Sequence, residues 1–329
     1  MRISILVPIQ KLSFFVYACY KNITETCGHD VDIVFVISKD VTPEVLRAIS
    51  ELSCRTIQVP ELHGDGIPHQ RMLDYVIRDS SLSDWVIIQH ADLFWKTQGW
   101  LDKILDAISA TNQTALPCIT YTKYFVQTQQ VLLVGDFFGV FNRRKLVSSK
   151  FSFCSKTITP SKTSRYLNKL IQSQKVNLNY GEWLDGSILM SVELAARNEV
   201  YRGLEILHDF VHLMAFYHIH HSFGVQDDIL MSWIPLDNFG GVDKAAWVRS
   251  FAIYAYLSTY VFDASETGHY LPWDVMERIC IRNNVDVKEI ESLCVWISGY
   301  GPVPTRLHTE RYRKIGFAKE FYQEDLSLL

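Results

Sequence analysis

The sequence predicts an α/β protein with a mostly parallel β-sheet flanked by helices and a mainly helical C-terminal extension. Short apolar runs that suit buried strands alternate with segments of helical periodicity through the first 120 residues. Such alternation is typical of right-handed strand–helix–strand units. Beyond residue 242 the apolar residues recur with helical spacing instead, over 244–262, 272–283 and 286–298.

Composition favours a chain with one large core. The 329 residues are 48% hydrophobic, which is enough for one large domain or for a domain with an appendage. We expect an α/β domain over residues 1–225 and the helical extension over 226–329. A net charge of −4 without any basic block argues against a nucleic-acid partner.

Cysteine usage and hydropathy predict a cytoplasmic protein. The seven cysteines are scattered and form no CxxC pair, so we expect reduced thiols rather than a disulfide framework or a zinc knuckle. The apolar run at the N-terminus is too short for a signal peptide. The longest apolar helix candidate, 245–262, contains Arg249 and is short for a membrane span, so we expect no transmembrane segment.

Five strands and four helices are expected in the first part of the chain. A continuous β-branched run suits a strand that is covered on both faces, as in Trp85–Gln89. Further strands are expected at Ile3–Val7, Asp32–Ile37, Arg55–Val59 and Leu116–Thr120. Helical periodicity marks segments 14–23, 43–52, 72–77 and 100–108 between them.

The fourth predicted strand ends in His90-Ala91-Asp92. In open α/β sheets, ligands bind beyond the carboxyl ends of the strands. A carboxylate at that place can hold a divalent cation, which can in turn hold a diphosphate. Asp92 is equally well explained as a residue that caps the turn after the strand. The triplet alone leaves both interpretations open.

Beyond residue 120 the regular alternation stops. The segment Val131–Phe141 is strand-like with glycine interruptions, and 151–175 is a polar loop. Glu182 and Asp185 precede a helical pattern, where an aspartate is commonly only an N-cap. The segment Glu205–Ile219 is strand-like and rich in histidine.

In order and spacing, these features resemble a nucleotide-sugar glycosyltransferase of the GT-A fold, and most closely the large inverting family of bacterial polysaccharide and glycan glycosyltransferases. The resemblance covers about the first 225 residues. It implies contacts with the donor nucleotide and its diphosphate or sugar for Pro8, Asp40, Gly66, Arg71, His90 and Asp136. It also implies that Asp185 is the general base, with Glu182 as the second choice.

The resemblance further implies a metal site. His90-Ala91-Asp92 occupies the place of the family's Asp-X-Asp motif, so Asp92 is the expected metal ligand, and His90 departs from the motif. Imidazole suits Mn²⁺ better than Mg²⁺, so Mn²⁺ is the expected cofactor. His218 and His220, which would share a strand face, are the candidate late ligands. His208 and His212 would also share a face, and a core role fits them equally well.

We therefore expect a metal-dependent transferase that moves a sugar from a UDP- or GDP-sugar to an acceptor hydroxyl with inversion. The acceptor is a saccharide, a lipid-linked glycan, a peptide or a small molecule. A nucleotidyltransferase of related fold is one alternative, although the segment after the first strand, Pro8–Leu12, lacks the glycine such enzymes carry. A non-catalytic nucleotide- or carbohydrate-binding protein is the other, because His90 replaces the first acid.

Overall fold

The protein is described by a computed structural model that covers residues 2–63, 68–116, 138–154, 156–157, 183–184, 190–191, 193–195, 197–201, 204–213, 244–262, 266 and 273–302. The chain forms two compact units. The first comprises Met1–Gln10, Ile23–Val41 and Ile49–Val211, and the second comprises Lys11–Asn22, Thr42–Ala48 and His212–Leu329. The predicted division after residue 225 falls outside the described residues and stays a prediction.

Strands and helices alternate through the first part of the chain, as the sequence predicts. The order is β1 (Ile3–Ile9), α1 (Ser13–Thr26), β2 (Asp32–Ile37), α2 (Pro43–Glu51), β3 (Arg55–Gln58), α3 (Pro68–Val76), β4 (Trp85–Gln89), β5 (Leu93–Trp95), α4 (Trp100–Ala110), β6 (Ala115–Leu116), β7 (Phe138–Asn142) and α5 (Arg143–Ser148). Shorter elements follow: β8 (Lys156–Thr157), β9 (Trp183–Leu184), the 3₁₀ helix η1 (Leu207–Asp209) and β10 (Phe210–His212).

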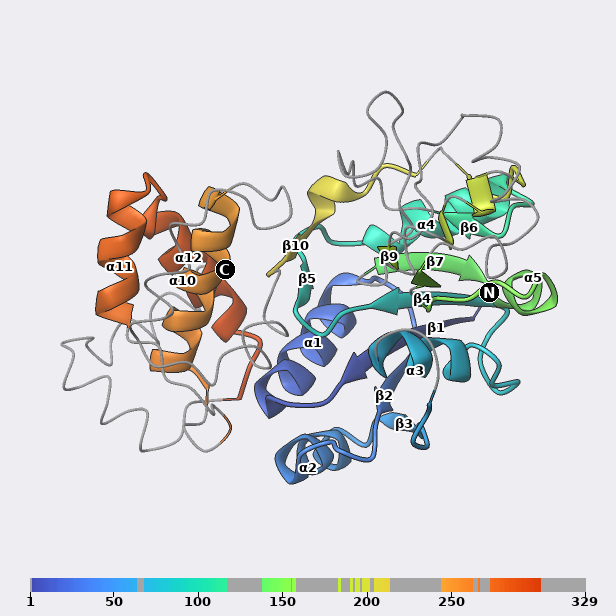
Figure 1. Ribbon diagram of the computed structural model, residues 1–329, viewed down its shortest axis with the longest axis horizontal. Helices are drawn as coiled ribbons and strands as arrows, with labels where there is room; N and C mark the ends of the chain where they lie inside the picture. The colour runs from blue at the N-terminus through green and yellow to red at the C-terminus, as the bar shows by residue number, and fades with distance from the viewer. Residues whose placement is uncertain are drawn as a thin grey trace. The chain divides into compact units, whose positions relative to one another are not determined.

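The first unit is built on a six-stranded sheet with the order β3-β2-β1-β4-β7-β6 (Figure 1). Strands β3, β2, β1 and β4 are parallel, whereas β7 is antiparallel to both β4 and β6. This arrangement confirms the predicted mostly parallel sheet. The chain moves outward from β1 to β3 and then returns to the other side of β1 as β4. The topological switch point, where ligands bind in open α/β sheets, therefore lies between β1 and β4.

Helices α3 and α4 cover opposite faces of this sheet (Figure 1). One face packs on α3 through a buried cluster that includes Leu6, Val86, Ile88, Leu73 and Val76. Because side chains alternate along a strand, Gln89 points to the other face. There its amide contacts Trp95, whose indole stacks on Trp100 of α4 with ring centroids 3.7 Å apart.

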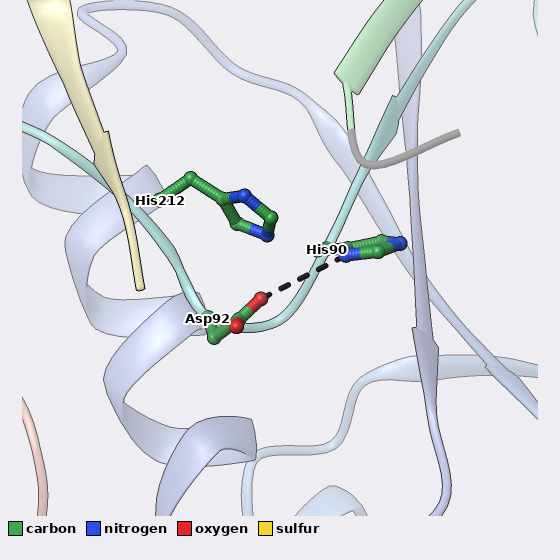
Figure 2. A group of neighbouring side chains, drawn as sticks. All are labelled: His90, Asp92 and His212. Carbon is green, nitrogen blue, oxygen red and sulfur yellow. Dashed lines mark ion pairs between the residues drawn. The ribbon is translucent and has the colours of Figure 1, made fainter. Parts of the chain in front are cut away.

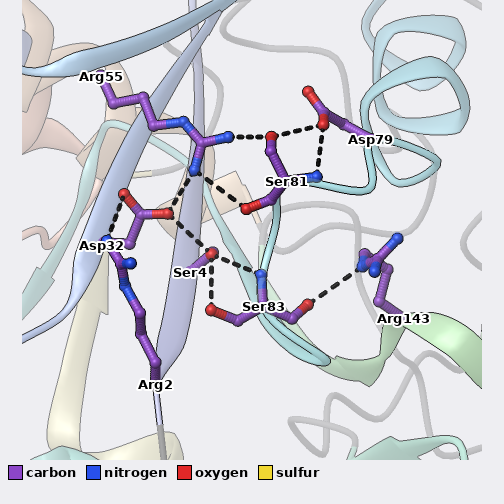
Figure 3. A network of polar contacts seen from close by, with 8 residues as sticks. All are labelled: Arg2, Ser4, Asp32, Arg55, Asp79, Ser81, Ser83 and Arg143. Carbon is purple, nitrogen blue, oxygen red and sulfur yellow. Dashed lines mark hydrogen bonds and ion pairs between the residues drawn. The ribbon is translucent and has the colours of Figure 1, made fainter.

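A polar network ties the amino ends of the strands together, at the edge of the sheet opposite to the expected ligand side (Figure 3). Asp32, at the start of β2, accepts hydrogen bonds from the Ser4 hydroxyl at 3.0 Å and from Arg55 Nη1 at 2.7 Å. Ser4 is fully buried and also contacts Ser83, just before β4. The network therefore links β1, β2 and β3 with the entry to β4.

Replacing Asp32 with alanine is expected to lower the free energy of unfolding by about 2–3 kcal/mol, because hydrogen bonds to a charged group are individually among the strong ones. The Asp32 side chain is only 9% exposed, so water can replace few of the hydrogen bonds that the substitution removes. Urea denaturation measures the difference. Asp30→Ala removes an exposed carboxylate nearby and is the matched control, with an expected change below about 0.5 kcal/mol. Equal stabilities of the two variants would contradict the role of Asp32.

The second unit contains the predicted C-terminal helices. They are α10 (Lys244–Tyr260), α11 (Trp273–Arg282) and α12 (Val287–Ser298), which confirm the three expected segments. Aromatic contacts within this unit join Tyr256 to Trp273 at 5.2 Å between ring centroids and Phe14 to Phe262 at 5.5 Å. Among the described helices, none is both long and apolar enough to cross a bilayer.

The six described cysteines are free thiols, and all but Cys54 are buried. Burial raises the pKa of Cys54 to about 11. The same cause raises the pKa of Cys154 and Cys280 to about 11 and that of Cys294 well above its usual value. These side chains act as small apolar residues in the packing, since a thiol of raised pKa is uncharged and weakly reactive.

Candidate metal centre

His90 and Asp92 lie in the tight turn between β4 and β5, at the carboxyl end of β4. The turn is closed by the Leu93 amide, which donates to the His90 carbonyl at 3.2 Å. The fully buried Gln89 braces it from behind: Nε2 donates to the Leu93 carbonyl at 3.1 Å, and Oε1 accepts from Trp95 Nε1 at 2.9 Å. A buried amide with both ends satisfied fixes the backbone and therefore where His90 and Asp92 project.

Strand β10 pairs with β5 in a separate two-stranded sheet and ends at His212. Its start is held by Asp209, whose carbonyl accepts from the Lys96 amide at 2.7 Å. The Asp209 carboxylate accepts from the Thr97 hydroxyl at 2.8 Å and forms an ion pair with Lys103 at 2.7 Å. These contacts anchor β10 to the segment after β5, and the pairing of the two strands brings His212 to the β4–β5 turn.

His90, Asp92 and His212 form a cluster of three possible metal ligands (Figure 2). One ligand atom from each lies within 4.8 Å of the others, and His90 Nδ1 is 3.9 Å from Asp92 Oδ1. A first-row metal binds nitrogen and oxygen at roughly 2.0–2.2 Å, so two ligands on opposite sides of one ion are about 4–4.4 Å apart. The 3.9 Å between His90 Nδ1 and Asp92 Oδ1 fits a single cation, and the His212 nitrogen, within 4.8 Å of both residues, is close to this range.

The donor set selects the kind of cation that the cluster could hold. Two imidazoles with one carboxylate suit transition metals such as Mn²⁺, Fe²⁺ or Zn²⁺, whereas Mg²⁺ prefers oxygen ligands. The side chains of His90 and Asp92 are only 29% and 13% exposed. Partial burial strengthens the attraction between the carboxylate and a cation, because water screens it less. Three protein ligands also leave coordination positions open for oxygens of a bound molecule.

The other predicted site residues in the described part of the chain lie along the same edge or near it. Pro8 is at the carboxyl end of β1, beyond Leu6, the last residue paired with β4. Asp40 is exposed in the turn after β2. Beside it, Lys39 forms an ion pair with Glu61 at 2.5 Å, and this hydrogen bond raises the pKa of Lys39.

Arg71 lies on α3 on the side of Cys154, close enough to act on the pKa of that thiol, although burial outweighs its effect. The remaining predicted site residues fall outside the described part of the chain, and their assignments stay predictions: Gly66, Asp136, Glu182, Asp185, His218 and His220.

The predicted histidine-rich strand is wrong in its first part. Residues 207–209 form η1, and the described strand there covers only Phe210–His212. His208 and His212 consequently do not share a strand face: His208 is exposed, and His212 is half-buried beside Asp92. The spacing of residues in the sequence could not show that His212 lies beside Asp92. This position depends on the pairing of β10 with β5, a strand far away in the sequence.

No protein-family model and no curated protein matches the chain. Among solved structures, the mannosyltransferase from Pyrobaculum calidifontis, in complex with GDP-Man and Mn²⁺, has a TM-score of 0.42 and 12% identity over 97% of this chain and 81% of that one. Glucosyl-3-phosphoglycerate synthase from Mycobacterium tuberculosis has a TM-score of 0.35 and 14% identity over 45% of this chain and 57% of that one. Mouse xyloside xylosyltransferase 1 has a TM-score of 0.39 and 9% identity, with coverages of 61% and 84%.

Proposed function

We propose that the protein is a metal-dependent glycosyltransferase that moves a sugar from a UDP- or GDP-sugar to an acceptor hydroxyl. One observation carries the proposal: His90, Asp92 and His212 gather at the carboxyl end of β4, next to the switch point between β1 and β4. This is the edge at which open α/β sheets bind nucleotides. A divalent cation at this place fits a ligand that carries a diphosphate.

The chemistry of glycosyl transfer explains why such a cluster is useful. When the bond between the sugar and the nucleoside diphosphate breaks, negative charge develops on the leaving phosphate, and a bound divalent cation stabilises it. Asp92 would supply the anionic ligand, and His90 and His212 the two neutral ones. In this proposal His90 binds the metal directly through its imidazole, so the departure from Asp-X-Asp does not remove the metal site.

The remaining roles in the proposal come from the sequence resemblance. Asp185, with Glu182 as the second choice, would take the proton from the acceptor hydroxyl, and direct in-line attack would invert the anomeric centre. Pro8, Asp40, Gly66, Arg71 and Asp136 would contact the donor. His218 and His220 remain candidates for further metal ligands.

Other functions use similar parts and must be separated from this one. Two histidines and one carboxylate also bind the metal in mononuclear iron oxygenases and in zinc hydrolases. A nucleotidyltransferase would use a metal with a nucleoside triphosphate, and a binding protein would hold a nucleotide without turnover. The location of the cluster at the switch point favours a nucleotide ligand. The identity of the molecule that binds would distinguish among these classes of protein.

A thermal-shift screen tests the proposal with UDP, GDP, CMP and dTDP, each with Mn²⁺, Mg²⁺, Zn²⁺ or EDTA. We expect the melting temperature to rise with one nucleoside diphosphate in Mn²⁺ and much less in Mg²⁺ or EDTA, because a ligand at 100 times its Kd stabilises the folded state by about 2.7 kcal/mol. An equal shift in EDTA would contradict the metal role. A shift with Zn²⁺ alone and none with any nucleotide would favour a metal enzyme of another class.

A further inference from the structure

We infer that His69 positions His90 for metal binding by fixing the tautomer and orientation of its imidazole; the inference rests on the proposed metal centre. The two ring nitrogens of His90 face different neighbours. Nδ1 faces the Asp92 carboxylate at 3.9 Å (Figure 2), and Nε2 lies 3.3 Å from Nε2 of His69. The His69 and His90 rings are nearly perpendicular, at 85°, with centroids 5.0 Å apart.

The fold itself produces this contact. Gln89 points to the face of the sheet that α4 covers, so the next residue, His90, leaves the strand toward the face that α3 covers. His69 is the second residue of α3. The helix is fixed on that face by its buried Leu73 and Val76, which belong to the same core cluster as Ile88 of β4. His69 is therefore held beside His90 by core packing and not by a mobile segment.

Metal binding at Nδ1 of His90 and the hydrogen bond to His69 require the same position of the His90 proton, on Nε2. A neutral imidazole carries one N–H group and one lone pair. If Nδ1 of His90 binds the cation, its proton is on Nε2, which then donates to Nε2 of His69. His69 accepts only in the tautomer that has its own proton on Nδ1. Outer hydrogen bonds of this type set the tautomer and ring orientation of ligating histidines and raise their basicity.

His69 is placed as a positioning residue and not as a fourth ligand. Within the described ranges, the group of possible ligands contains His90, Asp92 and His212, and His69 is not part of it. Its nitrogen approaches the Nε2 side of the His90 ring, which points away from Asp92 (Figure 2). If a cation bound between Asp92 and His90 Nδ1, His69 would contact the other ring nitrogen of His90 and not the cation.

The test compares Mn²⁺ affinity, measured by calorimetry and electron paramagnetic resonance, in wild type, His69→Phe and His69→Gln. His69→Phe keeps an aromatic ring without an acceptor, and we expect its affinity to fall roughly 10- to 100-fold. The glutamine oxygen can accept the proton of His90 Nε2, so His69→Gln should recover most of the affinity. His208→Phe removes an exposed histidine and is the matched control, with affinity unchanged.

A second readout reports the tautomer directly. Nitrogen-15 spectra of the metal-free protein should show the His90 proton on Nε2 in wild type and His69→Gln, and a mixture of tautomers in His69→Phe. Wild-type Mn²⁺ affinity in His69→Phe, or no recovery in His69→Gln, would overturn the inference while leaving the metal centre intact. Three directly coordinated nitrogens in the Mn²⁺ spectrum of the wild type and two in that of His69→Gln would make His69 a ligand and also overturn it. No Mn²⁺ binding by wild type would overturn the proposed function and this inference together.

Discussion

Replacing Asp92 with alanine is expected to lower Mn²⁺ affinity by more than about 100-fold, and Mn²⁺-dependent binding of UDP or GDP with it. Asp92 is the only carboxylate in the described ligand cluster. Its removal leaves two neutral imidazoles to hold a doubly charged ion, so the loss should exceed the roughly 10- to 100-fold effect of outer hydrogen-bond partners. Calorimetric titration with Mn²⁺, followed by nucleotide titration at fixed Mn²⁺, measures both effects.

Asp106→Ala is the matched control for Asp92→Ala, because it removes one negative charge from an exposed position on α4. Its Mn²⁺ affinity should equal that of the wild type. Circular dichroism and melting temperature verify that both variants are folded. A folded Asp92→Ala protein with unchanged Mn²⁺-dependent nucleotide affinity would exclude Asp92 as the metal ligand and remove the main support for the transferase proposal.

Replacing Asp185 with asparagine is expected to reduce the transfer rate about 10²- to 10⁴-fold, the usual contribution of a general base. Asparagine has nearly the same shape but cannot take the acceptor proton. Donor and Mn²⁺ binding should stay within about twofold of wild type, because the proposed metal ligands are unchanged. Single-turnover kinetics with the donor identified by the thermal screen separates the rate of transfer from donor affinity.

Glu182→Gln distinguishes the two candidate bases. If Asp185 is the base, Glu182→Gln should retain most of the activity, and a reversed result would assign the role to Glu182. Normal turnover in both variants would place the base elsewhere. Loss of donor binding in Asp185→Asn would indicate that this residue contacts the nucleotide-sugar itself.

Local sequence patterns predicted the elements that are long or buried on both faces. Strands β1, β2 and β4 are mostly apolar runs rich in β-branched residues, and α10, α11 and α12 have sustained helical spacing. The strands β5 and β10 were missed as strands of their own, because three residues are too few to establish a hydrophobic pattern. The antiparallel direction of β7 was also invisible, since strand direction depends on the path of the chain and not on composition.

The candidate metal centre was predictable only where it follows a buried strand. Asp92 and His90 stand directly after β4, so the general position of ligands at strand ends pointed to them. His212 required the pairing of β10 with β5, and His69 required the packing of α3 on the sheet. Both histidines enter the site through contacts between distant segments, which no motif in a single sequence encodes.

The buried thiols can report on the opening of each unit separately. A pKa raised from 9.0 to about 11 means that roughly 100-fold less thiolate is present near neutral pH, so an alkylating reagent reacts with a buried thiol mainly when its segment opens. The buried Cys154 belongs to the first unit, and the buried Cys280 and Cys294 belong to the second. Site-resolved labelling by mass spectrometry would therefore give an opening free energy for each unit. If a nucleotide with Mn²⁺ slows labelling of Cys154 alone, the ligand stabilises the first unit without suppressing fluctuations of the helical one.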